Sequence, residues 1–302
     1  MKLVTYRGRD EAARLAIWER DLVVDVERLG AAHALQLPGD MLTLIDMSST
    51  VLPLLHELLE RASGKYPVGA ARPVEDVQVL APIPRPRKNI FGIGLNYRSH
   101  VEESARTLDT ESNLPKQPVV FSKPPTTVIG PGDAIHHNAK VTQQLDWEVE
   151  LAVIIGRTAR RVCTETALAH VFGYSVLIDI SARDNRRAGQ WIISKGMDTY
   201  APFGPCIVTA DEIPDPHDLR LWLKKNGQMK QDSNTRHMIF NVPALIADLS
   251  TGITLEPGDV IATGTPEGVG AARVPPEWLW PGDVLEAGID GIGTLRHPIV
   301  AI

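Results

Sequence analysis

The chain has 302 residues, of which 43% are hydrophobic and 23% charged, and its formal net charge at pH 7 is −6. These values are ordinary for a globular protein of one large or two smaller domains. The negative charge argues against nucleic acid or an anionic membrane as the main partner. Because the N-terminus has no signal-like apolar segment and no stretch reaches roughly eighteen apolar residues, we expect a cytoplasmic protein.

Residues 1–65 predict a small α+β domain. Short strand patterns at 2–6, 12–18 and 22–26 are followed by a helical pattern with a leucine stripe at 50–62. Five prolines then fall between Pro67 and Pro86, which predicts a stiff, extended connector. We therefore place a proline-rich linker at 66–87.

Residues 88–302 predict a second domain that is mostly β. Turn signals precede strand patterns, with Pro-Gly-Asp at 131–133, 257–259 and 281–283. Asn226-Gly227 between two strand patterns is typical of a type I′ hairpin. Helical patterns are few, at 164–170 and 242–250, without strand–helix alternation. We expect a mostly β fold with α+β elements, in which this domain is a closed or rolled sandwich.

The stretch Asp146–Gly156 has the Val and Ile content of a strand. Side chains alternate between the faces of a strand, so Glu148 and Glu150 point the same way, roughly 7 Å apart. Two adjacent carboxylates on an apolar strand repel each other and resist burial. A bound cation is the simplest way to stabilise both.

Asp179 ends a second apolar strand pattern, ahead of a polar turn. A lone aspartate there is usually a cap or turn residue, but beside Glu148 and Glu150 it becomes a candidate third ligand. Three carboxylates without a nearby Cys or His pair suit Mg²⁺ or Mn²⁺, or also Ca²⁺, rather than Zn²⁺. Three protein ligands leave about half an octahedron open to water and substrate.

His100 and Glu103 are the candidate acid–base pair. If this segment is helical they share a face, and the carboxylate can orient the imidazole and keep its proton affinity near neutrality. An exposed polar helix with an incidental histidine is the alternative. Lys195 follows the Asp179 strand on a predicted loop and, by itself, is typical of surface charge.

Two glycine-rich segments do not predict an organic cofactor. Gly92 and Gly94 lack the third glycine and the βαβ unit of a dinucleotide fingerprint. The 262–270 loop lacks the Gly-Lys-Ser/Thr ending of a phosphate loop. Its amides or Thr265 could instead hold a carboxylate.

Five segments, in this order, resemble the fumarylacetoacetate hydrolase superfamily, in particular its bacterial two-domain members that act on small 2-oxo acids: GLNYRSHVEE, DWEVELAVIIG, DISARD, SKGMDTYAPFGP and ATGTPEGVG. The resemblance covers roughly 88–302, and residues 1–65 look like the variable N-terminal domain of such members. It implies a mixed β-sandwich roll for the catalytic domain, a small 2-oxo acid as substrate, and a homodimer.

The resemblance also implies residue roles. It makes Glu148, Glu150 and Asp179 the metal ligands, and it makes His100 with Glu103 the pair that activates water, on a lid over the substrate. The remaining implied roles are stabilisation of developing negative charge by Arg183 and Lys195, and substrate contacts by Tyr97, Gln190 and Thr265.

Arg186 departs from the family pattern. It stands where the family commonly carries a glutamine that helps to form the oxyanion site. Arginine adds a positive charge and a bidentate donor. Either Arg186 recognises an additional substrate carboxylate, or the loop has a different register.

The leading expectation is hydrolysis of a carbon–carbon bond in an acylpyruvate such as fumarylpyruvate. Water activated by His100 and Glu103 would attack the distal carbonyl, and the metal would hold the leaving enolate. The alternatives in the family are oxaloacetate decarboxylation, tautomerisation, and isomerisation or hydration of a 2-oxo-enoic acid. Outside it, the acids would bind a metal only to stabilise a structural or binding protein.

Overall fold

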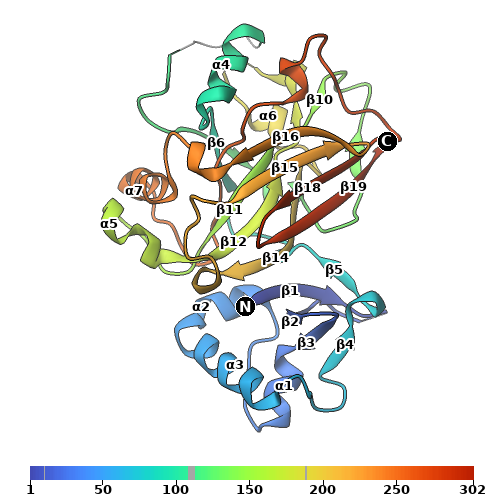
Figure 1. Ribbon diagram of the computed structural model, residues 1–302, viewed down its shortest axis with the longest axis vertical. Coiled ribbons are helices and arrows are strands. Elements are labelled where there is room, and N and C mark those ends of the chain that lie inside the picture. Colours follow the sequence, from blue (N-terminus) through green and yellow to red (C-terminus); the bar gives the residue numbers. More distant parts are fainter. Residues whose placement is uncertain (10, 108–112, 188) are drawn as a thin grey trace.

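The structure is a computed structural model that describes residues 1–9, 11–107, 113–187 and 189–302. The helices are α1 (Val26–Ala32), α2 (Met41–Asp46), α3 (Ser48–Ala62), α4 (Arg98–Thr107), α5 (Thr164–Ala167), α6 (Ile192–Lys195) and α7 (Val242–Gly252). Short 3₁₀ turns include η4 (Arg183–Asn185) and η7 (Gly270–Ala272). In Figure 1, α1–α3 lie beside the N-terminal strands at one end of the molecule, and α4 lies at the opposite end.

The strands of the N-terminal half are β1 (Lys2–Arg7), β2 (Arg14–Glu19), β3 (Leu22–Asp25), β4 (Ala71–Pro73), β5 (Gln78–Leu80), β6 (Ile90–Gly94), β7 (Val119–Lys123), β8 (Val128–Ile129), β9 (Ile135–His137), β10 (Leu145–Asp146) and β11 (Val149–Ile155). They are followed by β12 (Val171–Ile178), β13 (Ser181–Ala182), β14 (Ala201–Thr209), β15 (Arg220–Lys225), β16 (Gln228–Asn234), β17 (Val260–Ala262), β18 (Val284–Ile289) and β19 (Gly293–Ala301). The mixture of many strands with a few helices agrees with the predicted fold class.

One large sheet joins the two halves of the chain. Within the described residues its order is β4-β3-β2-β1-β14-β12-β11-β17-β6-β7, with β5 beside β1 and β8 beside β14. The N-terminal strands enter it where Leu3 of β1 pairs with Ile207 of β14. The predicted linker contributes β4 and β5 to the same sheet. The domain boundaries at 65 and 88 therefore stay a prediction, since the sheet runs across them.

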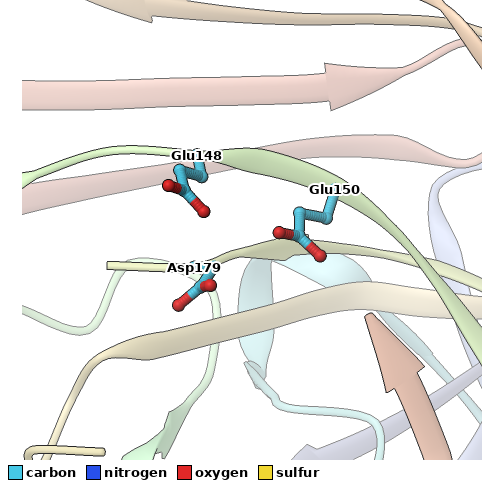
Figure 2. Close-up of side chains that lie close together, drawn as sticks. All are labelled: Glu148, Glu150 and Asp179. Atoms are coloured by element: carbon cyan, nitrogen blue, oxygen red, sulfur yellow. The ribbon is translucent and has the colours of Figure 1, made fainter. Parts of the chain in front are cut away.

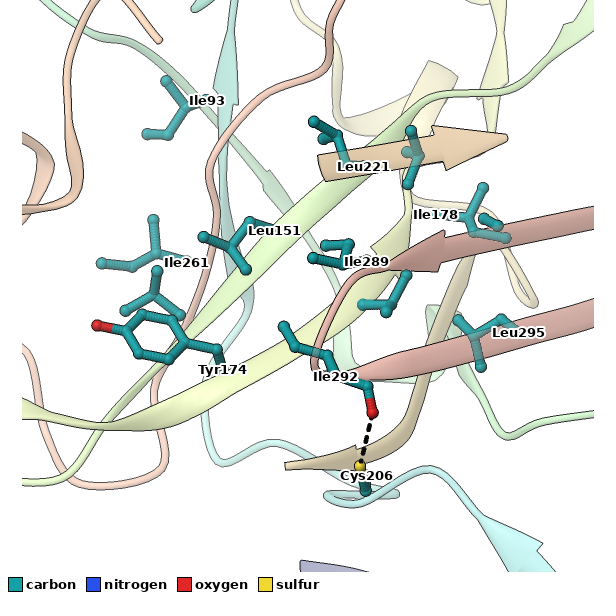
Figure 3. Close-up of a cluster of buried hydrophobic side chains, with 14 of the residues drawn as sticks. Ile93, Leu151, Tyr174, Ile178, Cys206, Leu221, Ile261, Ile289, Ile292 and Leu295 are labelled. Carbon is teal, nitrogen blue, oxygen red and sulfur yellow. Dashed lines mark hydrogen bonds between the residues drawn. The ribbon is translucent and has the colours of Figure 1, made fainter. Parts of the chain in front are cut away.

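A second sheet, in the order β16-β15-β18-β19-β9, packs against the first. Leu151 of β11, Leu221 of β15 and Leu295 of β19 belong to one buried cluster, drawn in Figure 3. The core therefore lies between two sheets, as the predicted sandwich requires. The predicted hairpin is confirmed as well, because Asn226 and Gly227 both have positive φ, 50° and 77°.

The central strand β11 is buried on both faces. Val149 and Leu151 enter the core between the sheets, whereas Ala152 and Ile154 join a second cluster with the helices of the N-terminal part. Strands covered on both faces need a nearly continuous apolar sequence. Glu150 interrupts that sequence, so the fold has to accommodate a buried carboxylate in the middle of the molecule.

Candidate active site

Glu148, Glu150 and Asp179 meet at one end of β11 and β12 (Figure 2). The ladder places them there, because Val149 pairs with Ile178 and the Asp179 amide donates to the Glu148 carbonyl at 2.8 Å. One oxygen of each carboxylate lies within 4.8 Å of the others, and all three side chains are buried. Glu148 and Glu150, predicted from strand alternation to share a face, and Asp179, the candidate third ligand, are brought together.

Cations surround two of the three carboxylates. The Lys195 ammonium donates to Glu148 Oε2 at 2.8 Å and to Asp179 Oδ2 at 2.5 Å. The Arg183 guanidinium donates to Glu148 Oε1 at 2.5 Å, and the Lys123 ammonium donates to Asp179 Oδ1 at 2.6 Å. Although burial alone would raise the pKa of Glu148, Lys195 and Arg183 hold it well below its usual range.

Glu150 is the exception. Its Oε2 accepts from the Gly264 amide at 2.8 Å, but its buried Oε1 has no hydrogen-bond partner among the described residues. Burial, with the charges of Asp179 and Glu148, raises the pKa of Glu150 well above that of an ordinary carboxylic acid. An unmatched carboxylate oxygen in an all-oxygen cluster fits a hard divalent cation. The residues present therefore suit the predicted metal.

The predicted pair lies on α4. His100 Nδ1 and Glu103 Oε1 are 2.8 Å apart, and both residues are buried. Glu103 Oε2 also accepts from the Gly268 amide at 3.0 Å, which fixes the carboxylate against the glycine-rich loop. Ser99 strengthens that contact by donating to Glu267 at 2.5 Å. The predicted helix turn and the His–Glu contact are both present, and their catalytic role stays a prediction.

A cavity of about 30 Å³ lies between α4, α6 and η4. Six predicted residues line it: His100, Glu148, Arg183, Arg186, Lys195 and Thr265. Glu150 and Asp179 belong to the acidic cluster that includes the lining residue Glu148. In this arrangement the cavity has room for only about two water molecules.

Two of the predicted substrate contacts, Tyr97 and Gln190, do not line the cavity, and the hydroxyl of a third, Thr265, is already hydrogen-bonded. Tyr97 lies in the core between the sheets, and its hydroxyl makes no hydrogen bond to a described residue. Gln190 is exposed and does not line the cavity. Thr265 reaches the cavity, but its hydroxyl donates to the Val149 carbonyl at 2.9 Å and accepts from Gln231 at 2.9 Å.

Arg186 lies on the cavity wall over the ring of Trp191, with its guanidinium carbon 5.1 Å from the ring centroid. It forms no hydrogen bond or ion pair with a described residue, and burial together with Arg183 lowers its pKa. Gly94 makes this arrangement possible, because a Cβ there would lie 2.4 Å from the Trp191 ring. Gly92 likewise makes room for Phe121, because a Cβ at Gly92 would lie 2.3 Å from the Phe121 ring. The glycine pair therefore accommodates aromatic rings.

Three buried polar residues of the site were missed by sequence reasoning: Lys123, Asp146 and Gln231. Asp146 accepts from Arg183 at 2.9 Å and from two amides of η7. Gln231, on the second sheet, accepts from the Val149 amide at 3.0 Å and donates to Thr265. The only local signal for Lys123 was a charged residue two positions after the apolar run 119–121.

Comparison with known proteins identifies the family. The profile described as "Fumarylacetoacetate (FAA) hydrolase C-terminal" matches residues 89–300. The chain belongs to this family. It is 46% identical over 227 residues to the oxaloacetate tautomerase YisK of Bacillus subtilis (strain 168), which covers 75% of this chain and 74% of that protein.

Solved structures of the family agree over the whole chain. A fumarylacetoacetate hydrolase from Exiguobacterium antarcticum aligns with 100% of both chains, at a TM-score of 0.82 and 35% identity. A maleylpyruvate hydrolase from Sphingobium sp. SYK-6, in complex with manganese(II) and pyruvate, aligns with 100% of this chain and 99% of its own. The TM-score is 0.78 and the sequence identity 32%.

These comparisons confirm the resemblance and the fold. Because the family is enzymatic and includes tautomerases and hydrolases, membership alone does not decide the reaction. The manganese complex and the buried acidic cluster together support a divalent metal. No described helix is long and apolar enough to cross a membrane. The expected homodimer stays a prediction.

Proposed function

We propose that the protein is a divalent-metal-dependent tautomerase, which interconverts the keto and enol forms of oxaloacetate or a similar four-carbon 2-oxo diacid. The observation that carries the proposal is Arg186, a guanidinium on the cavity wall without an anionic partner among the described residues. A substrate with a second carboxylate would supply that partner through a charge-assisted bond. The 46% identity to an oxaloacetate tautomerase supports the same class of substrate.

The acidic cluster would hold the metal. Bound by Glu148, Glu150 and Asp179, a divalent ion would act as a Lewis acid that engages the oxygens of a 2-oxo acid and stabilises negative charge on the carbonyl oxygen. The oxygen-only ligand set favours Mg²⁺ or Mn²⁺. Manganese(II) occurs in the solved maleylpyruvate hydrolase structure.

His100 is the proposed acid–base group. Since Nδ1 is bonded to Glu103, Nε2 is the nitrogen available to take the proton from C3 of the keto acid. The C3–H electron pair then forms the C2=C3 double bond while the C2=O π pair moves onto the oxygen, and the protonated His100 returns its proton to that oxygen to give the enol and a neutral imidazole. Glu103 stabilises the imidazolium that forms, while Lys195 and Arg183 supply positive field beside the oxygen.

The comparisons support this alternative better than the hydrolysis that the sequence led us to expect. Keto–enol conversion needs one substrate and two proton transfers, without a separate attacking water. Hydrolysis of an acylpyruvate remains an outcome for the assay, because a maleylpyruvate hydrolase shares the fold at 32% identity.

The test follows enol–keto interconversion of oxaloacetate by ultraviolet absorbance, with metal-free protein and with added Mg²⁺ or Mn²⁺. We expect metal-dependent acceleration that is lost in His100→Gln, without release of CO₂ or pyruvate. If interconversion is not accelerated and pyruvate is released from an acylpyruvate instead, the protein is a hydrolase. CO₂ release at a matching rate would indicate a decarboxylase.

Arg186 gives a sharper version of the test. Arg186→Gln introduces the residue common in the family, and removing a hydrogen bond to a charged group costs about 1.5–3 kcal/mol. We therefore expect kcat/KM for oxaloacetate to fall about 10- to 100-fold. Arg187→Gln, at the exposed neighbouring position, is the matched control and should stay near the unmodified value. Equal losses in both variants would contradict carboxylate recognition by Arg186.

A further inference from the structure

Lys123 is a buried lysine at the end of β7, and neither the sequence motifs nor the proposed chemistry uses it. Its side chain is 0% exposed. It lies between Asp179, the last of the three acidic residues, and the end of α6, which carries Lys195. A lysine is almost never fully buried unless its charge is paired, so its surroundings require an explanation.

The Lys123 ammonium uses all three of its hydrogens. It donates to Asp179 Oδ1 at 2.6 Å, to the Ile180 carbonyl at 3.4 Å and to the Lys195 carbonyl. An ammonium has three donors and no acceptor, so this set of partners is complete. One side chain thus connects a candidate metal ligand to the main chain at both Ile180 and Lys195.

Lys195 shows a different pattern around the same aspartate. Its ammonium also has three acceptors, but they are all side-chain atoms, on Glu148, Asp179 and Ser181. Two of the three acceptors of Lys123 are main-chain carbonyls, which cannot rotate away. Lys195 also lines the cavity, whereas Lys123 does not. The two lysines therefore hold different oxygens of Asp179, Lys123 being anchored to the main chain and Lys195 lining the cavity.

We propose that Lys123 is a positioning residue of the metal centre, which fixes the Asp179 carboxylate and the end of α6 so that the three acidic side chains face one another. Because Oδ1 is held by Lys123, the carboxylate cannot turn away from Glu148. The role rests on the metal site of the proposed function but not on the identity of the substrate. Residues that orient metal ligands typically contribute 10- to 100-fold to metal affinity.

The direction in which metal affinity changes when Lys123 is removed distinguishes a positioning role from a purely electrostatic one. If Lys123 acted only through its charge, its removal would make the cluster more negative and metal binding tighter. If it positions Asp179, its removal leaves Oδ1 and the Lys195 carbonyl without a donor, and binding becomes weaker. The two roles therefore predict opposite changes in the same dissociation constant.

The experiment measures Mn²⁺ binding to the purified metal-free full chain by titration calorimetry. We expect Lys123→Met to weaken binding by about tenfold or more. The matched control is Lys225→Met, since Lys225 is another buried lysine, paired with Glu277 and Asp283 away from the acidic cluster. The control should bind Mn²⁺ within about twofold of the unmodified protein. Unchanged or tighter binding by Lys123→Met, or an equal loss in the control, would overturn the proposal.

A measurement without a Lys123 variant covers the case in which Lys123→Met does not fold. In ¹⁵N-lysine NMR, a buried ammonium with all hydrogens bonded exchanges slowly and gives its own signal. The signals that vanish in Lys195→Met and in Lys225→Met belong to those two lysines. The Lys123 signal should persist when Mg²⁺ is added, and the exchange rate of its ammonium hydrogens should stay the same. Loss of its protection on Mg²⁺ binding would refute a fixed role.

These outcomes are separate from those of the proposed function. Absence of Mn²⁺ binding to the unmodified chain would overturn the metal centre, and the role of Lys123 with it. Normal Mn²⁺ binding with no action on oxaloacetate would overturn only the substrate. Normal binding in both the unmodified chain and Lys123→Met would overturn only the role of Lys123.

Discussion

Two regions of the molecule bury acidic side chains, and they do so in different ways. In the N-terminal part, Asp25 is 2% exposed and precedes α1. Its Oδ2 accepts from Tyr6 at 2.6 Å and from Arg14 at 2.5 Å, and its Oδ1 accepts from Arg14 at 3.0 Å and from the Arg28 amide at 2.8 Å. Both oxygens of this carboxylate are fully matched by donors.

The acidic cluster is equally buried but incompletely matched. Three carboxylates lie together, and Glu150 Oε1 has no donor among the described residues. Nearly all buried polar atoms in native proteins are hydrogen-bonded, so an exception calls for a cause. Burial of an acid therefore does not by itself indicate function. A buried carboxylate oxygen without a donor, next to other carboxylates, indicates a cation site.

The largest expected effect comes from Glu150→Gln. Loss of one of three metal ligands should reduce turnover by about 10³-fold, since metal stabilisation of a developing charge is worth several kcal/mol. The metal-free variant should be at least as stable as the unmodified protein, because a neutral amide does not repel Asp179 and Glu148. Turnover and thermal denaturation in EDTA measure the two effects. Retained turnover, or a large loss of metal-free stability, would place Glu150 in the same class as Asp25.

Local sequence was sufficient to predict the Glu148–Glu150 pair and the His–Glu pair. Glu148 and Glu150 are separated by one strand period, and His100 and Glu103 by one helical turn, so each pair is fixed within a few residues. Asp179 needed only a strand end and the recognised motif order. The hairpin at Asn226-Gly227 was equally local, because its backbone requires positive φ at both positions.

Residues whose roles depend on distant partners could not be predicted. Lys123 is 56 residues from Asp179, and Gln231 is 82 residues from Val149. Gln190 was predicted from a motif match, but its side chain is exposed, although the next residue, Trp191, lines the cavity. The merging of the N-terminal strands with the main sheet was missed for the same reason, since β1 pairs with β14 about 200 residues later.

The second effect concerns stability. Asp25→Asn removes the charge that pairs with Arg14, and breaking a largely buried pair should lower the free energy of unfolding by about 3 kcal/mol. Turnover and Mn²⁺ affinity of the folded variant should stay near the unmodified values, because Asp25 lies outside the site. Denaturant unfolding and activity measured on the same preparation test this. Loss of metal affinity would mean that the two acidic regions are coupled.

A third, smaller effect follows from metal binding itself. A ligand that binds only the folded state stabilises it by about 1.4 kcal/mol at ten times its Kd. We expect this gain with Mn²⁺ or Mg²⁺ in the unmodified protein and in Asp25→Asn, and none in Glu150→Gln. Thermal denaturation with and without the metal measures the shift. An equal shift in Glu150→Gln would indicate binding elsewhere.

The smallest expected effect concerns how the free energy of unfolding changes with pH in the acid range. Although burial would raise the pKa of Asp25, its bonds to Arg14, Tyr6 and the Arg28 amide hold it below the ordinary value of 3.8. The ionised Asp25 therefore contributes its full stabilisation at pH values well above 3.8. This contribution is lost as the pH falls below 3.8 towards the lower pKa of Asp25 in the folded state. The difference in unfolding free energy between the unmodified protein and Asp25→Asn should accordingly stay constant down to about pH 5 and narrow below it. Denaturant titrations in EDTA at each pH measure it. A gap of constant size would mean that the hydrogen bonds of Asp25 stabilise the protein independently of its charge.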